Sequence, residues 1–253
     1  MKARMIVSDL DGTLLRDDKT ISDFTIDIIK KYQSKGGIFV AATARPVRAA
    51  SEYMKILNLN AGIFHNGAVI QEKGQKTGGY GVENAGRLVQ VILERYPFSN
   101  IAVEAEDVLY ANFEADRLWP GAEYITCESF AQLRGKTADK IIVEVTSLSE
   151  MEKYKALLPD ELYIQRSENK IGMIMNQSAT KYHAISFLAE RYHISTDDII
   201  AFGDDYNDLE MIKKCGKGIA VGNALEMVKG AADEVCESNQ KDGVARWIEG
   251  NLL

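Results

Sequence analysis

Two aspartates lie two residues apart near the start of the chain, in the segment Val7-Ser8-Asp9-Leu10-Asp11-Gly12-Thr13. The apolar residues before them predict a strand, and side chains two apart on a regular strand point to the same face. Gly12 predicts that the strand then ends in a tight turn. Two crowded carboxylates are costly unless a cation lies between them, so the spacing indicates a metal site. A polar turn without chemistry is the alternative.

A second acidic cluster, Gly203-Asp204-Asp205-Tyr206-Asn207-Asp208, follows the apolar run 199–202. If Asp204 begins a helix, Asp204 and Asp208 project to the same side, because residues four apart are neighbours on a helix. Together with Asp9 they supply the oxygen ligands that Mg²⁺ prefers, with room left for waters and a phosphate. We therefore expect Mg²⁺ as the cofactor.

Apolar runs and amphipathic segments alternate around these clusters, which predicts a parallel sheet with helical crossovers. The run Ile38–Ala42 is continuously apolar, as expected for a strand covered on both faces, and it ends in Thr43-Ala44-Arg45. A shorter strand at 61–64 ends in His65-Asn66-Gly67. Ligands bind outside the carboxyl ends of parallel strands, so all of these polar clusters are expected to converge on one crevice.

The alternation is interrupted between residues 82 and 178, where short alternating strands and two helices predict an α+β unit. The polar, glycine-rich stretch from Lys73 to Gly81 indicates a connection out of the first domain. The predicted fold class is therefore α/β, with a Rossmann-like parallel sheet core formed by residues 1–81 and 179–253. The insert at 82–178 has no dense cluster of catalytic residue types, which suits a cap domain that selects what enters the site.

Bulk properties limit the partners. The formal net charge of -7 argues against nucleic acid as the main partner, and no apolar stretch approaches membrane-spanning length. The three cysteines are odd in number and widely spaced, and the three histidines are scattered, so we expect a reduced, cytoplasmic protein without zinc. These properties leave the oligomeric state open.

Four segments, taken in order, resemble the four signature motifs of the haloacid dehalogenase (HAD) superfamily over the whole chain. The motifs are Asp9-x-Asp11-Gly12-Thr13-Leu14, Thr43, Lys181, and Gly203-Asp204-Asp205-x-Asn207-Asp208. More narrowly, three further segments are similar to the Cof-type sugar-phosphate phosphatase branch, whose α/β cap lies between the second and third motifs: Asn66-Gly67-Ala68, Gly222-Asn223-Ala224 and Asp242-Gly243-Val244-Ala245. The resemblance implies a HAD-type phosphoric monoester hydrolase with an HAD-like core.

The residue types agree with the mechanism that this resemblance implies. Asp9 is expected to be the nucleophile that forms an aspartyl-phosphate, and Asp11 the general acid and then the general base. Mg²⁺ would be held by Asp9, the backbone carbonyl of Asp11, and Asp204. Phosphate or substrate contacts are expected from Thr43, Ala44, Lys181, Asn66 and Asn207, while Asn207 and Asp208 are placed around the metal, partly through waters.

Several of these residues have simpler interpretations when taken singly. Thr43 could be a helix cap, Lys181 a solvated helix charge, and Arg45 a member of a structural ion pair. Asn66-Gly67 by itself is a hairpin turn signal. The family usually has glycine where Ala44 stands, so the methyl group there crowds a backbone N–H that would contact phosphate. It commonly has a small residue where Asp205 stands, so Asp205 is left out of the metal site.

The leading functional hypothesis is a Mg²⁺-dependent phosphatase that hydrolyses a small phosphomonoester, such as a sugar phosphate or a similar metabolite. One alternative is a phosphotransferase or phosphomutase that passes the same aspartyl-phosphate to a sugar hydroxyl. The other is a non-enzymatic phospholigand sensor on the same fold. A sensor need not retain Asp11, and this chain has it.

Overall fold

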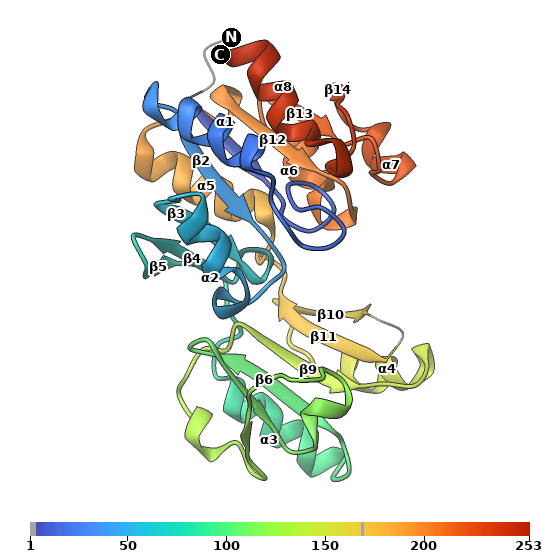
Figure 1. Cartoon of the computed structure of the whole chain (residues 1–253). Coiled ribbons are helices and arrows are strands. Elements are labelled where there is room, and N and C mark those ends of the chain that lie inside the picture. The colour runs from blue at the N-terminus through green and yellow to red at the C-terminus, as the bar shows by residue number, and fades with distance from the viewer. Residues whose placement is uncertain (1–3, 168–169) are drawn as a thin grey trace. The chain divides into compact units, whose positions relative to one another are not determined.

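The computed structural model describes residues 4–167 and 170–253, which fold into two compact units. The first unit consists of the described residues up to Gly79 together with Thr180–Leu253. The second is formed by the described residues of Tyr80–Ala179. Each unit is built around one sheet (Figure 1).

An eight-stranded sheet forms the centre of the first unit, in the order β14-β13-β12-β1-β2-β3-β4-β5. The strands from β14 to β3 are parallel, and β4 and β5 are antiparallel additions at one edge. This arrangement confirms the predicted α/β fold class. The strand bounds are β1 (Met5–Ser8), β2 (Ile38–Ala42), β3 (Ala61–Phe64), β4 (Val69–Glu72), β5 (Gln75–Gly78), β12 (Ile199–Gly203), β13 (Lys217–Ala220) and β14 (Glu234–Val235).

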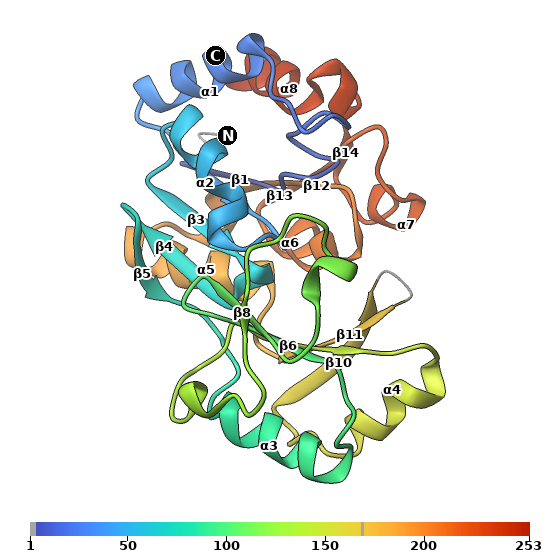
Figure 2. The same ribbon diagram turned by 60° about the horizontal axis from the view of Figure 1, so that its bottom comes forward.

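Helices cover both faces of this sheet, because its central strands are apolar on both sides. Ile6 of β1 packs in the same core cluster as residues of α1 and α8, whereas Met5 and Val7 pack with residues of α5 and α6. Figure 2 shows α1 and α8 on one side of β1 and β12, and α5 and α6 on the other. The helix bounds are α1 (Asp23–Ser34), α2 (Val47–Ile56), α5 (Lys181–Tyr192), α6 (Leu209–Lys214), α7 (Glu226–Lys229) and α8 (Gly243–Leu252).

The segment predicted to connect the two domains is for the most part a hairpin. Lys73 (φ 51°) and Gly74 (φ 77°) form its turn, and β4 and β5 pair on either side of them. Two residues with positive φ suit the tight turn of a β-hairpin. Strand β5 lies at the sheet edge and carries polar side chains, so its composition resembles that of a linker. The interpretation of residues 73–78 as a connection was therefore wrong.

The second unit contains a six-stranded, mainly antiparallel sheet in the order β10-β11-β9-β6-β7-β8, with α3 and α4 on one face (Figure 2). Its elements are α3 (Ala85–Arg95), β6 (Ile101–Ala105), β7 (Val108–Ala111), β8 (Ile125–Thr126), β9 (Lys140–Glu144), α4 (Leu148–Lys155), β10 (Leu162–Ser167) and β11 (Ile171–Asn176). Among the residues described in both units, no helix has the length and apolar character needed to cross a membrane.

Candidate active site

Four neighbouring strands of the first unit, β12, β1, β2 and β3, end side by side and bring distant segments together. The parallel register continues one step beyond the strands. The N–H of Asp9 donates to the carbonyl of Phe202 at 3.0 Å, and the N–H of Thr43 donates to the carbonyl of Ile63 at 2.8 Å. The polar clusters that follow these strands therefore begin at one edge of the sheet.

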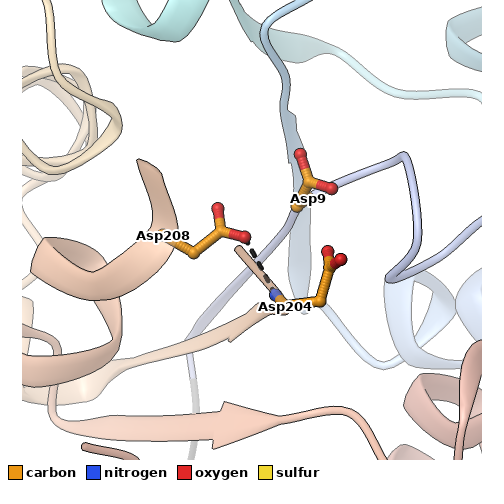
Figure 3. Close-up of side chains that lie close together, drawn as sticks. All are labelled: Asp9, Asp204 and Asp208. Carbon is orange, nitrogen blue, oxygen red and sulfur yellow. Dashed lines mark hydrogen bonds between the residues drawn. The ribbon is translucent and has the colours of Figure 1, made fainter. Parts of the chain in front are cut away.

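Three carboxylates meet at this edge. One oxygen each of Asp9, Asp204 and Asp208 lies within 4.8 Å of the other two (Figure 3). Asp9 and Asp208 are buried, at 6% and 0% exposure, and Asp204 is partly exposed. Buried carboxylates at such separations repel one another and require a cation.

Lys181 supplies one positive charge to this group. Its Nζ donates to Asp9 Oδ1 at 2.6 Å and to Asp208 Oδ1 at 2.7 Å, and the side chain is buried. Thr180 caps the helix α5 by accepting the N–H of His183, which fixes Lys181 at the first helical position. The alternative that Lys181 is a solvated helix charge is therefore wrong.

Asp208 is held by the backbone of its own loop. Its Oδ2 accepts the N–H groups of Asp204 at 2.9 Å, drawn dashed in Figure 3, and of Asp205 at 3.1 Å. Asp205 begins a 3₁₀ turn, Tyr206–Asp208, in a capping box with Asp208. Asp204 therefore precedes the helical turn and does not begin a helix, because Asp205 takes the capping position.

Asp204 packs directly against the turn that follows Asp9. Thr13 Oγ1 donates to Asp204 Oδ1 at 2.5 Å. Gly12 has a φ of +79°, and a Cβ atom there would lie 2.5 Å from Asp204 Oδ2. Any other residue would be strained at this φ and would have to displace the Asp204 carboxylate, so glycine suits this turn because it lets the carboxylate approach closely.

Burial and crowding change the ionisation of the group. Burial raises the pKa of Asp9 to about 8 although the Lys181 charge opposes it. Burial also raises the pKa of Asp204 to about 6, against the hydrogen bond from Thr13. For Lys181, burial lowers the pKa, but the charges of Asp208 and Asp9 outweigh burial and raise it above its usual range.

These residues fit a hard divalent cation. The donors are carboxylate oxygens, and burial disfavours the ionised forms of Asp9 and Asp204 as they stand. A divalent ion would offset the charge that burial disfavours.

Asp11 lies apart from the three carboxylates. Strand β1 ends at Ser8, so neither Asp9 nor Asp11 is on regular strand, and the condition under which they would share a strand face is not met. Both Asp11 oxygens are bound by Arg45, from Nε at 2.6 Å and from Nη2 at 2.7 Å, and Oδ1 also accepts from Lys19 Nζ at 2.8 Å. Burial raises the Asp11 pKa, but these hydrogen bonds outweigh it and lower the pKa to about 2.

Tyr53 closes a ring of contacts around Asp11. The Arg45 guanidinium lies 5.2 Å from the centroid of the Tyr53 ring, and the Tyr53 hydroxyl donates to the carbonyl of Lys19 at 3.0 Å. Lys19 itself has a φ of 66°. Lys19 and Tyr53 belong to no motif, so no sequence signal marks them, whereas Arg45 was predicted as a possible member of a structural ion pair.

The remaining predicted contacts surround this edge. Thr43 is buried, and its Oγ1 accepts the N–H of Arg45 at 3.1 Å, whereas Ala44 is exposed. The amide Nδ2 of Asn207 donates to Asn66 Oδ1 at 2.9 Å. Asn66 has a φ of 56° and donates its backbone N–H to the carbonyl of Thr43 at 3.0 Å. Residues 65–68 join the antiparallel strands β3 and β4, so the interpretation of Asn66-Gly67 as a hairpin turn is confirmed.

Comparison with known proteins places this geometry in context. Residues 6–248 match the model of a family described as haloacid dehalogenase-like hydrolase. The 5-amino-6-(5-phospho-D-ribitylamino)uracil phosphatase YitU of Bacillus subtilis is 28% identical, covering 98% of this chain and 97% of that protein. The pyridoxal phosphate phosphatase YbhA of Escherichia coli is 25% identical, and the match covers 100% of this chain and 100% of that protein.

Solved structures give the same result for the fold. A haloacid dehalogenase-like hydrolase from Bacteroides thetaiotaomicron superposes with a TM-score of 0.84 at 26% identity, covering 98% of both chains.

Proposed function

This chain belongs to the family of haloacid dehalogenase-like hydrolases, and we propose that it is a Mg²⁺-dependent phosphatase of small phosphomonoesters that works through an aspartyl-phosphate. The observation that carries the proposal is the group of Asp9, Asp204 and Asp208 around the buried Lys181. Relatives named as phosphatases over nearly the whole chain support the reaction class.

Asp9, Asp204 and the backbone carbonyl of Asp11 would hold the Mg²⁺, and Asp208 would orient Asp204 and Lys181. When bound, the ion supplies positive charge that offsets the repulsion between the carboxylates and the phosphate. Asp208 suits an orienting role because both of its oxygens already accept hydrogen bonds from this loop and from Lys181.

In the first step a carboxylate oxygen of Asp9 forms a bond to phosphorus while the bond to the ester oxygen breaks. Lys181 donates to Asp9 Oδ1 at 2.6 Å, which fixes the orientation of the nucleophile. The protonated carboxyl of Asp11 gives its proton to the departing oxygen, and the alcohol leaves.

In the second step water attacks the phosphorus of the aspartyl-phosphate. Asp11, now ionised, takes a proton from that water, and the bond between phosphorus and the Asp9 oxygen breaks. Inorganic phosphate leaves, Asp9 is again a carboxylate, and Asp11 is again protonated. Asp11 therefore acts as the acid in the first step and as the base in the second, and it ends the cycle in the protonation state in which it began.

The phosphoryl oxygens would be held by Lys181, by the Thr43 hydroxyl, by the backbone N–H of Ala44, and by the Asn207 and Asn66 amides. Ala44 is an exposed residue two positions after the end of β2. The hydrogen bond between Asn207 and Asn66 supports a joint role for these two amides.

We propose that the second unit, residues 80–179, selects the ester. All of the side chains assigned to the chemistry belong to the first unit, which leaves specificity to the other one. Replacing this unit with that of another family member should change the preferred ester and keep the Mg²⁺ requirement. Loss of the requirement in the chimaera would contradict this division of roles.

Three cysteines without disulfide partners, Cys127, Cys215 and Cys236, support a reducing compartment, and we propose the cytoplasm.

The decisive experiment is a panel of phosphate esters assayed with Mg²⁺ on the wild-type chain and two variants. The panel includes sugar phosphates, pyridoxal 5′-phosphate, nucleotides and polyol phosphates. Asp9→Asn should abolish phosphate release, whereas Asp205→Asn, in the same loop but outside the carboxylate group, should retain most of it. Turnover that persists in Asp9→Asn would exclude Asp9 as the nucleophile.

A phosphotransferase or phosphomutase is distinguished by the fate of water. If the reaction is hydrolysis, ¹⁸O from labelled water enters the released phosphate. Transfer of the phosphoryl group to an added sugar without incorporation of label would favour the alternative, and binding of esters without turnover of any of them would favour the sensor.

A further inference from the structure

The turn formed by residues 222–225, here called the Asn223 turn, contacts both loops that carry the carboxylates. Asn223 Nδ2 donates to the carbonyl of Gly12 at 2.7 Å. The N–H of Leu225 donates to the carbonyl of Asp204 at 2.9 Å. One short turn is therefore bonded to the loop that follows Asp9 and to the residue that supplies the Asp204 carboxylate.

The two segments that the Asn223 turn contacts, the loop after Asp9 and Asp204, are also in contact with each other. Thr13 Oγ1 donates to Asp204 Oδ1, and a Cβ atom on Gly12 would lie 2.5 Å from Asp204 Oδ2. Glycine permits many backbone conformations, so the Gly12 peptide needs an external restraint to keep one of them. The hydrogen bond from Asn223 to the Gly12 carbonyl is such a restraint.

The orientation of the Asn223 amide is fixed from its other end. Asn223 Oδ1 accepts the backbone N–H of Asn239 at 2.9 Å. Asn239 is 2% exposed, and its Nδ2 donates to the carbonyl of Leu15 at 3.0 Å. With its oxygen bound to an N–H group, Asn223 must present its NH₂ group to Gly12.

Resting on the proposed function, we propose that Asn223 is a positioning residue that sets the distance between the Asp9 loop and Asp204, and thereby the affinity of the site for Mg²⁺. Asn223 does not belong to the carboxylate group and is assigned no contact with the substrate. Residues that orient metal ligands through hydrogen bonds commonly change metal affinity by about tenfold or more when they are replaced.

Two variants separate the hydrogen bond from other effects. Asn223→Ala removes both amide contacts. Asn223→Asp keeps an oxygen for the Asn239 N–H but places the other oxygen against the Gly12 carbonyl. Asn251→Ala is the matched control, because Asn251 is an exposed asparagine of α8 whose Nδ2 donates to the carbonyl of Trp247.

The experiment is calorimetric titration of each full-length variant with Mg²⁺ alone, together with the Mg²⁺ dependence of p-nitrophenyl phosphate hydrolysis. Both Asn223 variants should bind Mg²⁺ roughly tenfold more weakly than wild type. Their kcat at saturating Mg²⁺ should fall much less, and Asn251→Ala should match wild type. Thermal melts without Mg²⁺ verify that each variant is folded.

Equal Mg²⁺ affinity in wild type and Asn223→Ala overturns the inference. The inference is also overturned if Asn223→Asp binds Mg²⁺ more tightly than wild type while the affinity of Asn223→Ala is unchanged. The added negative charge alone would then explain the effect. A wild-type chain that binds no Mg²⁺ overturns it together with the metal assignment. If wild type binds Mg²⁺ but hydrolyses no ester, the proposed function fails, and the calorimetric comparison still decides the role of Asn223.

Discussion

Arg45 and Asp11 form a two-bond ion pair, with the Arg45 Nε 2.6 Å from Asp11 Oδ2 and the Arg45 Nη2 2.7 Å from Asp11 Oδ1. With the Lys19 contact, the pair lowers the Asp11 pKa to about 2, although burial acts in the opposite direction. A carboxyl in this state has lost its proton at neutral pH. Asp11 as observed is therefore in the form of a base, and the pair must open before Asp11 can act as an acid.

Arg45→Ala should destabilise the protein by about 1 kcal/mol at pH 7, allowing for the partial exposure of both side chains. The folded-state pKa of Asp11, about 2, is below its ordinary value of 3.8, so its stabilisation is present above pH 3.8 and is lost as the pH falls through 2. Urea unfolding at pH 7 and near pH 3 measures the change.

Arg191→Ala is the control for Arg45→Ala, because Arg191 forms a single-bond pair with Glu72. A double-mutant cycle with Asp11→Asn isolates the pairwise coupling. A coupling indistinguishable from zero at pH 7 would contradict the stabilising role of the pair.

Asp11→Asn should produce a burst with p-nitrophenyl phosphate. The nitrophenolate leaving group needs little protonation, so formation of the aspartyl-phosphate continues, whereas attack by water loses its base. Steady-state turnover should fall by about 10²–10⁴-fold. Rapid-quench kinetics should detect about one equivalent of nitrophenol per enzyme. A linear time course without a burst would show that Asp11 does not assist the second step.

Lys181→Met should be strongly destabilising, by about 3–5 kcal/mol, because it leaves the buried Asp9 and Asp208 without their shared cation. The loss should be larger at pH 8 than at pH 5, since protonation relieves the repulsion. Lys214→Met removes an exposed pair with Glu210 and should cost less than about 0.5 kcal/mol. Equal losses in the two variants, measured by urea unfolding, would contradict the assigned environment of Lys181.

Mg²⁺ binding should weaken as the pH falls. The pKa of Asp204 is raised to about 6, so protons compete with the ion below that pH, and affinity should fall by about tenfold per pH unit. The raised pKa of Asp9 acts in the same direction. Calorimetry at pH 5–8, in buffers of different ionisation enthalpy, measures both the affinity and the protons released. An affinity that is independent of pH over this range would exclude these carboxylates as ligands.

The sequence predicted the parts of the fold in which local and global signals agree. The run Ile38–Ala42 became strand β2 with the predicted bounds, because continuous apolar residues between Gly37 and Thr43 fit only a buried strand. Ser22, a residue type that favours helix N-caps, caps α1, and its side chain accepts the N–H of Thr25. Strand β5 could not be recognised in this way, because an exposed edge strand has no apolar periodicity.

The contacts within the candidate site were harder to predict from the sequence than the elements of the fold. Types and spacing predicted the residues of the carboxylate group, but the direction of each side chain depends on the turns after the strands. Asp9 accepts a hydrogen bond from Lys181, whereas Asp11 accepts hydrogen bonds from Arg45 and Lys19. No periodic pattern in the sequence distinguishes these two sets of partners. Lys19 lies in a loop held by the Tyr53 hydroxyl, so its position follows from tertiary structure alone.

The close approach of Gly12 to Asp204 also limits how this chain can change over generations. Every other amino acid carries a Cβ atom, which at this position would lie 2.5 Å from Asp204 Oδ2. No single-base change in the Gly12 codon that alters the residue can therefore be accepted without moving Asp204. This codon is therefore under selection both for catalysis and for the conformation of the turn. In a lineage that has lost the reaction, we expect residues other than glycine at this position.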